Sequence, residues 1–470
     1  MMRDAEPAFI QNLTYAEIRI GDSARLARTL RPEDIELFAA MSGDVNPTHV
    51  DPEYARSSEF REVVAHGMWG GSLISAVLGT QFPGPGTVYI DQALHFTRPV
   101  AVGDTITVTV TASRKFDHNH HIVFDCLCVN QDGLEVIRGA AEVLAPTEKV
   151  KRLRVALPEV TISDKAQRYR HLLSLAAGLP PIPIAVAHPC DLEALRGPLN
   201  ARNAGLVVPV LVGPENRIRA LAEQHALDLT GVRIVDAPHS HAAAMRSVEL
   251  ARAGEVEALM KGSLHTDEFM GAVVAREGGL RTARRISHVF VLDVPTYPRP
   301  LMITDAAINV EPTLEDKVDI VQNAIDLACL LGIAEPKVAI LAAIETVNPK
   351  MRATIDAAAL CKMADRGQIR YGLLDGPLAF DNAISMVAAK TKGIRSVVAG
   401  QADILVVPDL ESGNMLAKQL EYLGDALAAG IVLGARVPIV LTSRADFAET
   451  RTASCAIALR MVRAMQKSTP

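Results

Sequence analysis

An aspartate and a histidine five residues apart are the pair in this sequence best suited to acid–base chemistry. Asp44 and His49 lie in the polar segment Ser42–Asp51, which contains glycine and proline and follows a predicted amphipathic helix. A loop of this kind lets a carboxylate and an imidazole converge on one water molecule and move protons near neutral pH. The alternative is an Asx-turn at Asp44 and a helix cap at Asp51, which is ordinary chemistry for Asp-x-Asn-Pro.

A second candidate pair is Ser443-Arg444, near the end of the chain. It follows the predicted strand Val437–Leu441 and opens a predicted helix, so a hydroxyl, a guanidinium and helix N-terminal amides come together. Arginine presents a fork of donors that suits phosphate oxygens, and helix N-termini favour anions. The alternative is that the serine only caps the helix.

The histidine-rich segment and the cysteines could in principle bind a metal, but neither shows the pattern of a metal site. The histidine-rich segment Phe116–His121 lies between two predicted strands, where a polar hairpin tip is expected, so we predict no metal site there. The six cysteines include no CxxC pair or zinc-like cluster. We interpret them as free thiols of a reducing cytoplasm.

The composition is typical of a soluble protein with two or three domains. The chain has 470 residues, of which 49% are hydrophobic and 22% charged. Its net charge of −6 argues against nucleic-acid binding, which needs clustered Lys and Arg. Residues 1–7 do not resemble a signal peptide, and no apolar run reaches the roughly 18–20 residues that span a bilayer. We therefore expect a cytoplasmic protein without a membrane partner.

Residues 1–146 predict one apolar helix wrapped by an antiparallel sheet. Pro32 opens a first helix, since proline is harmless in a first turn, and apolar spacing predicts a second over Met68–Thr80. In Thr105–Thr111, threonines alternate with Ile and Val, the period of a half-buried strand. Other predicted strands are Leu26–Leu30, Thr87–Phe96, His121–Val129 and Glu135–Leu144. Residues 147–163 are basic and have little period, so we interpret them as a linker.

Residues 164–470 alternate short apolar strands with longer helices, which predicts an α/β domain with a parallel sheet. About ten strands favour two subdomains around a cleft, with ligands at the carboxyl ends of the strands. No GxGxxG turn or GxxxxGK[ST] loop points to a dinucleotide or ATP. The predicted strands are Ile182–Ala187, Gly205–Val212, Val232–Val235, Glu257–Met260, His288–Leu292, Leu301–Thr304, Val338–Leu341, Tyr371–Leu374, Ile404–Val407 and Val437–Leu441.

The segment that holds Asp44 and His49 resembles the signature of the MaoC-like, (R)-specific enoyl-CoA hydratases, which have an α+β hot-dog fold. The resemblance covers nearly all of residues 20–145 and includes Val64-Ala65-His66-Gly67-Met68, Gly84-Pro85-Gly86, Tyr89–Phe96 and Arg98-Pro99-Val100. It implies that Asp44 and His49 are the catalytic pair and that backbone N–H groups near His66 and Gly67 bind the thioester oxygen. It also implies a homodimer or higher homo-oligomer.

The C-terminal half, residues 165–468, resembles the phosphate acetyltransferases and phosphate butyryltransferases. Five pieces match in order: Thr304–Asn309, Val347–Met351, Asp375–Asp381, Pro408–Asn414 and Thr442–Asp446. The resemblance implies that Ser443 and Arg444 form the transfer centre and that Gly413, Asn414 and Asn309 bind substrate. It implies coenzyme A thioesters and inorganic phosphate as substrates, with no bound cofactor.

Three positions depart from, or add to, the acetyltransferase pattern. An acidic residue that follows the Ser-Arg pair in acetyltransferases falls on Thr450, with Glu449 beside it, and a cysteine common in the Asp305 motif is Ala306. These departures are more typical of butyryltransferases and leave the acyl-chain preference open. Lys261, at a strand end, is either a phosphate contact or a solvated lysine.

Three functions remain in competition at this point. The first is a bifunctional enzyme with hydratase and acyltransferase sites. The second is an active hydratase whose C-terminal domain only binds acyl-CoA or mediates dimerisation. The third is an acyl-CoA sensor without turnover, against which the presence of both Asp44 and His49 argues.

Overall fold

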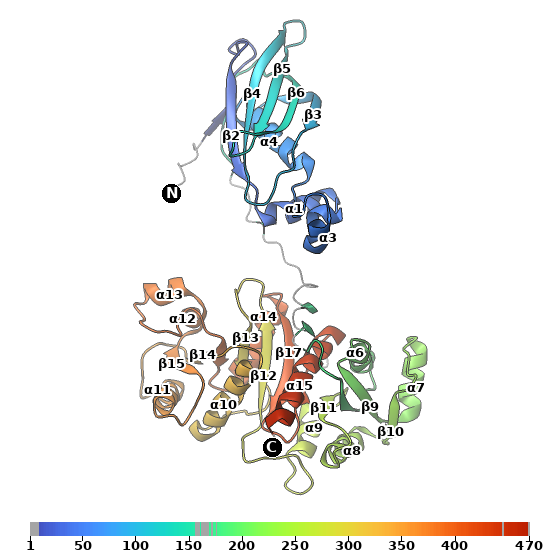
Figure 1. Ribbon diagram of the computed structural model, residues 1–470. Coiled ribbons are helices and arrows are strands. Elements are labelled where there is room, and N and C mark those ends of the chain that lie inside the picture. The colour runs from blue at the N-terminus through green and yellow to red at the C-terminus, as the bar shows by residue number, and fades with distance from the viewer. Residues whose placement is uncertain are drawn as a thin grey trace. The chain divides into compact units, whose positions relative to one another are not determined.

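A single apolar helix packed against an antiparallel sheet forms the first of two units in the chain (Figure 1). The computed structural model describes residues 9–155, 160, 169–170, 173–174, 176–443 and 446–468. The first unit spans Met1–Ser163 and the second spans Asp164–Pro470.

The sheet of the first unit has five strands, and every neighbouring pair is antiparallel. Its order is β2-β4-β5-β6-β3, so β2 and β3 form its edges. The strands are β2 (Ser23–Thr29), β3 (Val88–Phe96), β4 (Thr105–Phe116), β5 (His121–Val129) and β6 (Glu135–Leu144). In β4 the side chains of Ile106, Val108 and Val110 are fully buried, which is the alternation that the sequence predicts.

Helix α4 (Gly67–Thr80) packs against this sheet through small residues. A β-carbon at Gly70 would lie 2.4 Å from Cδ1 of Ile137, and one at Gly67 would lie 3.2 Å from the ring of Phe96. Any larger side chain at Gly70 therefore requires Ile137 to move. The close approach sets the N-terminus of α4 beside the end of β3.

Three short helices connect β2 to α4: α1 (Pro32–Ser42), α2 (Pro47–Val50) and α3 (Pro52–Ser57). The prediction that Ser42–Asp51 is a loop is wrong for its second half, because His49 lies in α2. Pro47 occupies the first helical position, and the Asn46 side chain accepts a hydrogen bond from the Thr48 N–H at 3.2 Å. These two features build one helical turn.

The predicted linker, residues 147–163, is partly incorporated in the first unit. β7 (Lys151–Leu153) pairs antiparallel with β1 (Phe9–Gln11), and Lys149 forms an ion pair with Glu17. A three-residue strand is too short to produce a visible period, so composition alone did not predict it. Most of 154–163 lies outside the described residues.

The second unit is built on one sheet of eleven strands in the order β10-β9-β8-β11-β18-β17-β12-β13-β16-β14-β15. The strands are β8 (Ile182–Ala187), β9 (Val207–Gly213), β10 (Arg233–Asp236), β11 (Ala258–Lys261), β12 (Ser287–Asp293), β13 (Leu301–Thr304), β14 (Lys337–Leu341), β15 (Leu373–Leu378), β16 (Ile404–Val406), β17 (Leu427–Leu433) and β18 (Ile439–Val440).

The prediction of a wholly parallel sheet is wrong at its centre. The pairs β18–β17, β17–β12 and β12–β13 are antiparallel, whereas the outer strands on each side form parallel blocks. β17, which the sequence did not predict, pairs antiparallel with both β18 and β12, and β12 in turn pairs antiparallel with β13. The two predicted subdomains are therefore the two parallel blocks of one continuous sheet.

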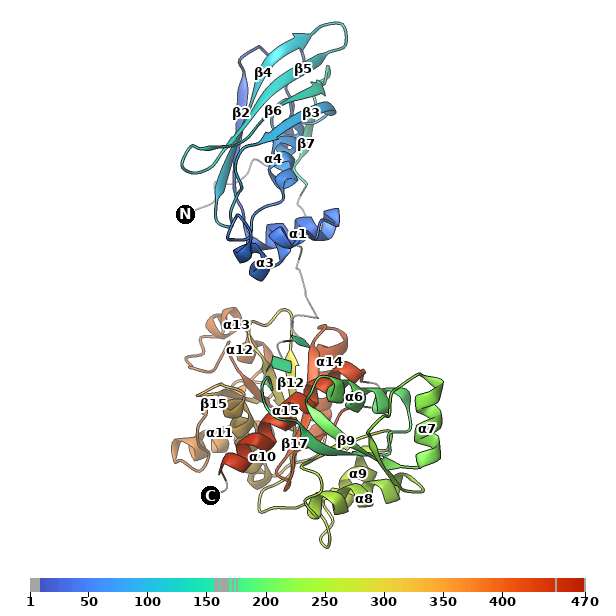
Figure 2. The ribbon, with the colours of Figure 1, turned by 45° about the vertical axis from the view of Figure 1, so that its right-hand side comes forward.

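Helices cover both faces of this sheet, as alternate residues of β8 show: Ile184 and Val186 belong to one core cluster, Ala185 and Ala187 to another. One face carries α6 (Leu192–Asn203), α7 (Glu215–Gln224), α10 (Leu314–Leu330), α11 (Arg352–Asp365) and α15 (Ala448–Ser468). The other carries α8 (Ser240–Arg252), α9 (Thr266–Val273), α12 (Phe380–Ile384), α13 (Met386–Thr391) and α14 (Leu410–Tyr422). Figure 2 shows α15 lying across the sheet beside α6. Among the described helices, none is both long and apolar enough to cross a membrane.

Candidate functional sites

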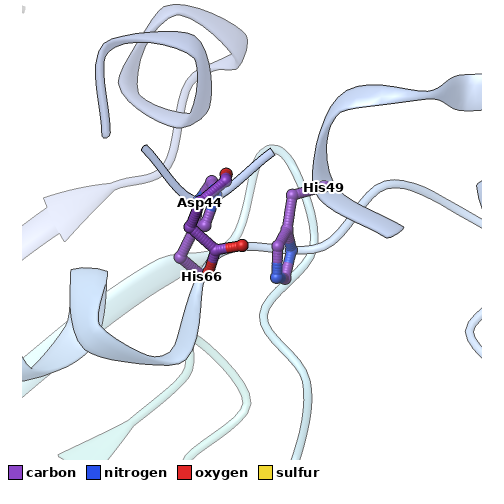
Figure 3. Close-up of side chains that lie close together, drawn as sticks. All are labelled: Asp44, His49 and His66. Carbon is purple, nitrogen blue, oxygen red and sulfur yellow. The ribbon is translucent and has the colours of Figure 1, made fainter. Parts of the chain in front are cut away.

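Three side chains converge in the first unit: Asp44, His49 and His66 (Figure 3). A ligand atom from each lies within 4.8 Å of those of the other two, and the Asp44 carboxylate points toward the His49 ring. Asp44 is exposed, His49 half-buried and His66 buried. The structure thus brings the two predicted acid–base residues together and adds a third that the sequence analysis considered only for its backbone.

Asp44 lies in a tight turn between α1 and α2. Its Oδ1 accepts the Asn46 N–H at 3.2 Å, and its own N–H donates to Ser42 Oγ at 3.2 Å. Asp51 caps α3 by accepting the N–H groups of Glu53 and Tyr54. The Asx-turn and the helix cap are therefore both present, and they fix the direction of the Asp44 side chain while its carboxylate stays accessible.

The environment of His49 defines which ring nitrogen carries the proton. Its Nδ1 lies 2.8 Å from the carbonyl oxygen of Val64. A carbonyl only accepts, so Nδ1 donates and, in the neutral ring, Nε2 is an acceptor. His49 is thus set up to accept a proton through Nε2.

His66 supports both partners through its side chain. Its Nε2 lies 2.9 Å from the backbone carbonyl of Asp44, and its ring centroid lies 4.1 Å from that of His49 and 4.9 Å from that of Phe38. It is only 2% exposed, and its Nδ1 has no hydrogen-bond partner among the described residues. A lone histidine before a glycine gives no sequence signal for this role.

A cavity of about 340 Å³ opens beside these side chains. Its walls are mostly apolar, with His49 and His66 among the few polar groups; they are formed by His49, Phe60, Val64, Ala65, His66, Gly67, Trp69, Gly70, Phe96, Thr97, Arg98, Pro99, Val100 and Ile137. His66 is the N-cap of α4, whose first-turn N–H groups favour negative charge. The cavity therefore combines mostly apolar walls with a helix N-terminus that favours negative charge.

In the second unit, the peptide groups on both sides of Ser443 are held by buried charges. The Ser443 N–H donates to Asp446 Oδ2 at 2.7 Å, and its carbonyl accepts from Arg451 Nη2 at 3.0 Å. Arg451 is fully buried, and burial lowers the pKa of its guanidinium. Arg444, the other half of the predicted pair, lies outside the described residues.

Asp446 belongs to a cluster of charges that reaches α14. Lys418 Nζ lies 3.0 Å from Asp446 Oδ1 and 2.7 Å from Glu421 Oε2. Burial raises the pKa of the Glu421 carboxyl, and the Lys418 ammonium opposes that effect. The cluster ties Asp446 to α14, which carries Gly413 and Asn414.

The other predicted binding residues gather around Asp305 and Ala306. Asn309 Nδ2 donates to Asp305 Oδ2 at 2.5 Å, and Asn414 Nδ2 donates to the Ala306 carbonyl at 3.2 Å. A β-carbon at Gly413 would lie 3.0 Å from the Asp305 carbonyl oxygen, so this position admits only glycine without a shift of α14. Asn309, Gly413 and Asn414 thus share one neighbourhood.

His288, in β12, is close enough to both Asp305 and Asp446 to feel their charges. No sequence signal points to it, because it lies within an apolar strand. It is fully buried, and its Nε2 lies 3.1 Å from the Leu441 carbonyl oxygen. Burial lowers the pKa of its imidazole, while the negative charges of Asp305 and Asp446 act in the opposite direction.

The structure shows how far Lys261 and the neighbours Glu449 and Thr450 are exposed to solvent. Lys261 is 2% exposed, so the interpretation as a solvated lysine is wrong. Thr450, at the position of the expected acid, is buried in α15, whereas its neighbour Glu449 is exposed.

The fold and sites define a protein that joins a hot-dog domain to an α/β domain of the phosphate acyltransferase type. Residues 240–459 match the family model described as Phosphate acetyl/butaryl transferase, and residues 17–126 match the MaoC like domain. The chain is 62% identical over 291 residues to a phosphate acetyltransferase of Rhizobium meliloti, which covers 62% of this chain and 92% of that protein. It therefore belongs to the phosphate acetyl/butyryl transferase family, with a MaoC-like domain at its N-terminus.

Two further similarities fall on the separate units. A branched-chain phosphotransacylase from Enterococcus faecalis V583 matches with a TM-score of 0.53 and 30% identity, covering 60% of this chain and 99% of that structure. The R-hydratase PhaJ1 from Pseudomonas aeruginosa is 42% identical over 33% of this chain and 99% of its own length, with a TM-score of 0.32. The predicted fold class is confirmed by the two family models and by the two separate sheets of the structure.

Proposed function

We propose that this chain is an acyl-CoA enzyme with two active sites. The first unit hydrates trans-2-enoyl-CoA to 3-hydroxyacyl-CoA, with the R configuration expected from the MaoC-like resemblance. The second unit transfers an acyl group between coenzyme A and inorganic phosphate. The convergence of Asp44 and His49 beside an apolar cavity supports the first activity most directly, and family membership supports the second.

Hydration needs one water held between the carboxylate of Asp44 and Nε2 of His49. One of the two groups removes a proton from the water as its oxygen bonds to C3 of the enoyl group. A proton is then delivered to C2, so that the elements of one water add across the C2=C3 bond. The geometry suits either residue for either transfer.

Negative charge develops on the thioester oxygen as C2 becomes enolate-like. The first-turn N–H groups of α4 at Gly67, next to His66, lie at the wall of the cavity and at the positive end of the helix dipole. They are the donors that stabilise this oxygen. The apolar walls formed by Trp69, Phe96 and Ile137 accommodate the acyl chain.

Acyl transfer joins a phosphate oxygen to the thioester carbon and breaks the carbon–sulfur bond. The phosphate hydroxyl proton ends on the sulfur of coenzyme A, so no other reactant or cofactor is required. Ser443 and Arg444 act at this centre, where a hydroxyl and a guanidinium stabilise the oxyanion and the departing thiolate. Asn309, Gly413 and Asn414 shape the adjoining substrate site.

Self-association of the first unit is supported by the edge strand β3. Its side chains Val88, Ile90 and Phe96 are each about half exposed, and an exposed apolar edge strand is a template for pairing. We infer that two copies of the chain associate through this edge. Analytical ultracentrifugation of wild type and Ile90→Lys would test it, since a monomeric wild type contradicts the inference.

One observation favours a second candidate for the C-terminal unit. Thr450 replaces the acid expected after the Ser-Arg pair, and a domain without that acid would still bind acyl-CoA. An active acyltransferase and a domain that only binds acyl-CoA differ in whether they turn over substrate, which a direct assay of acyl transfer measures.

The deciding experiment measures both reactions on one preparation of the full chain. Loss of enoyl absorbance from crotonyl-CoA reports hydration, and phosphate-dependent release of coenzyme A from acetyl-CoA and butyryl-CoA reports transfer. Both signals are expected, and the ratio of the two acyl substrates defines chain preference. Hydration without transfer would leave the second unit as a binding module, and absence of hydration would refute the role of the first.

A further inference from the structure

Strand β18 parts from its neighbour β17 just before Ser443. The two strands pair in register over two residues, and beyond them the Leu441 N–H still donates to the Gly430 carbonyl at 3.2 Å. A hydrogen-bonded antiparallel pair normally exchanges two such bonds. Here the Gly430 N–H donates instead to Ser454 Oγ at 2.9 Å. The Leu441 carbonyl accepts from His288 Nε2 at 3.1 Å. Two side chains thus replace one bond of the ladder where the chain leaves the sheet.

His288 reaches the Leu441 carbonyl across an intervening strand. It belongs to β12, and β17 lies between β12 and β18. Gly430 of β17 leaves room for the imidazole, since a β-carbon there would lie 3.0 Å from His288 Nε2 and 2.4 Å from the Leu441 oxygen. A carbonyl only accepts, so Nε2 carries the proton of this bond. The bond therefore depends on a glycine in one strand and a histidine in the next.

The backbone of His288 is attached to the other half of the proposed transfer site. Its carbonyl accepts from Thr304 Oγ1 at 2.8 Å, and Thr304 precedes Asp305. The Asp305 carboxylate in turn accepts from the N–H and the side-chain amide of Asn309. One buried residue is therefore hydrogen-bonded both to the chain that leads to Ser443 and to the chain that leads to Asp305.

The surroundings of the His288 ring favour a neutral imidazole. The residue is 0% exposed, and its Nδ1 has no hydrogen-bond partner among the described residues. Burial lowers the pKa of the imidazole; the charges that act on it are those of Asp305 and Asp446, which oppose that effect, and of Lys418, which adds to it. A neutral ring that donates through Nε2 holds a peptide group in place and has no route to exchange protons with solvent.

We propose that His288 is a positioning residue for acyl transfer, which sets the direction in which the chain leaves β18 and so places Ser443 in the transfer site. The inference rests on the proposed acyl transfer and adds to it a residue that touches neither substrate. A displacement of about 1 Å in a reacting group lowers a rate by about 100-fold. A hydrogen bond two residues before Ser443 is close enough to control a displacement of that size.

The test compares transfer by full-length His288→Met and His288→Gln. Met removes the donor and keeps most of the volume, whereas the amide of Gln reaches about as far as Nε2. Val291→Ala is the matched control, because it removes buried volume from the opposite face of the same strand. In His288→Met we expect kcat to fall by about 10- to 100-fold, with the Michaelis constants within about threefold of wild type. His288→Gln should recover part of this loss, and Val291→Ala should keep kcat within about twofold of wild type.

A second readout does not require turnover. The Leu441 and Ser443 N–H groups should exchange with deuterium about tenfold faster or more in His288→Met than in wild type, and His288→Gln should restore part of their protection. Peptic fragments that contain residues 438–443 report this exchange by mass spectrometry. If His288→Met does not fold, His288→Asn replaces it in both measurements, since its amide is too short to reach the Leu441 carbonyl.

The contrary outcomes are distinct for the two proposals. A wild-type kcat in His288→Met overturns the positioning role, and so does a loss in His288→Gln or Val291→Ala equal to that in His288→Met. A wild type without transfer refutes the proposed activity alone if the difference in exchange remains. If that difference is absent as well, both proposals are refuted.

Discussion

The imidazole Nε2 of His66 donates to the backbone carbonyl of Asp44 at 2.9 Å, so the residue that begins the central helix also holds the turn that carries the carboxylate. The same ring packs against His49 at a centroid distance of 4.1 Å. One buried side chain therefore sets the relative positions of both proposed acid–base groups and of the helix N-terminus. His66 is a positioning residue in this arrangement.

His66→Ala should lower kcat for hydration by about 10- to 100-fold, because a displacement of about 1 Å in a catalytic group has effects of that size. His66→Gln, whose amide N–H reaches a similar point, should recover part of the loss. The measurement is crotonyl-CoA hydration by the three proteins at matched folded fractions. Equal losses in both variants, or none, would contradict a role through the Asp44 carbonyl.

Asp44→Asn should lower hydration by about 10²–10⁴-fold, because the amide keeps the shape but removes a carboxylate that takes part in the proton transfers. Acyl transfer by the same protein should not change. Asp132→Asn is the matched control, since Asp132 is an exposed residue in the turn between β5 and β6. A decline of both activities in Asp44→Asn would show that the two sites are not independent.

Asp446 should matter for transfer through the backbone of Ser443. Asp446→Ala removes the acceptor of the 2.7 Å bond from the Ser443 N–H and should lower kcat for transfer by about 10- to 100-fold. Asp446→Asn keeps an acceptor oxygen and should remain within about fivefold of wild type. A merely structural role would change melting temperature in both variants without this difference in kcat.

The control for this comparison is Asp365→Asn, an exposed aspartate paired with Lys362. It changes one carboxylate of the same unit and should leave kcat and the Michaelis constants as they are. If Asp446→Ala retains the wild-type kcat, Ser443 does not depend on Asp446.

The sequence predicted the regular elements wherever an amphipathic or apolar period was long enough. The strand Thr105–Thr111 and the helix Met68–Thr80 fall within one or a few residues of β4 and α4. The central reversal of the second sheet was not predictable, because strand direction is a property of pairing partners rather than of the strand's own residues. β7 was not predicted either, because a strand of three residues is too short to show a periodic pattern.

The candidate sites show the same limit. Asp44 and His49 are close in sequence, so a turn and one helical turn suffice to bring them together. His66 and His288 enter their sites through hydrogen bonds to the carbonyls of Asp44 and Leu441, which lie 22 and 153 residues away in the sequence. Residue type and local spacing carry no information about such contacts.

The ion pair between Glu17 and Lys149 makes the stability of the first unit depend on acidity. Hydrogen bonding to Lys149 lowers the pKa of Glu17 from 4.5 to about 2. A carboxyl with a lowered pKa in the folded state contributes stability that is present above its unfolded pKa and is lost as the pH falls through the folded value. The contribution should therefore disappear between about pH 4.5 and pH 2.

Trp69 is the single tryptophan of the chain and is buried in the first unit, so its fluorescence reports unfolding of that unit alone. The melting temperature followed at Trp69 should fall more steeply below pH 4.5 in wild type than in Glu17→Gln, with the two curves converging near pH 2. Lys149→Met should reproduce the flatter curve, because it removes the same partner. Parallel curves for wild type and both variants would mean that the pair does not hold the 147–153 segment in the first unit.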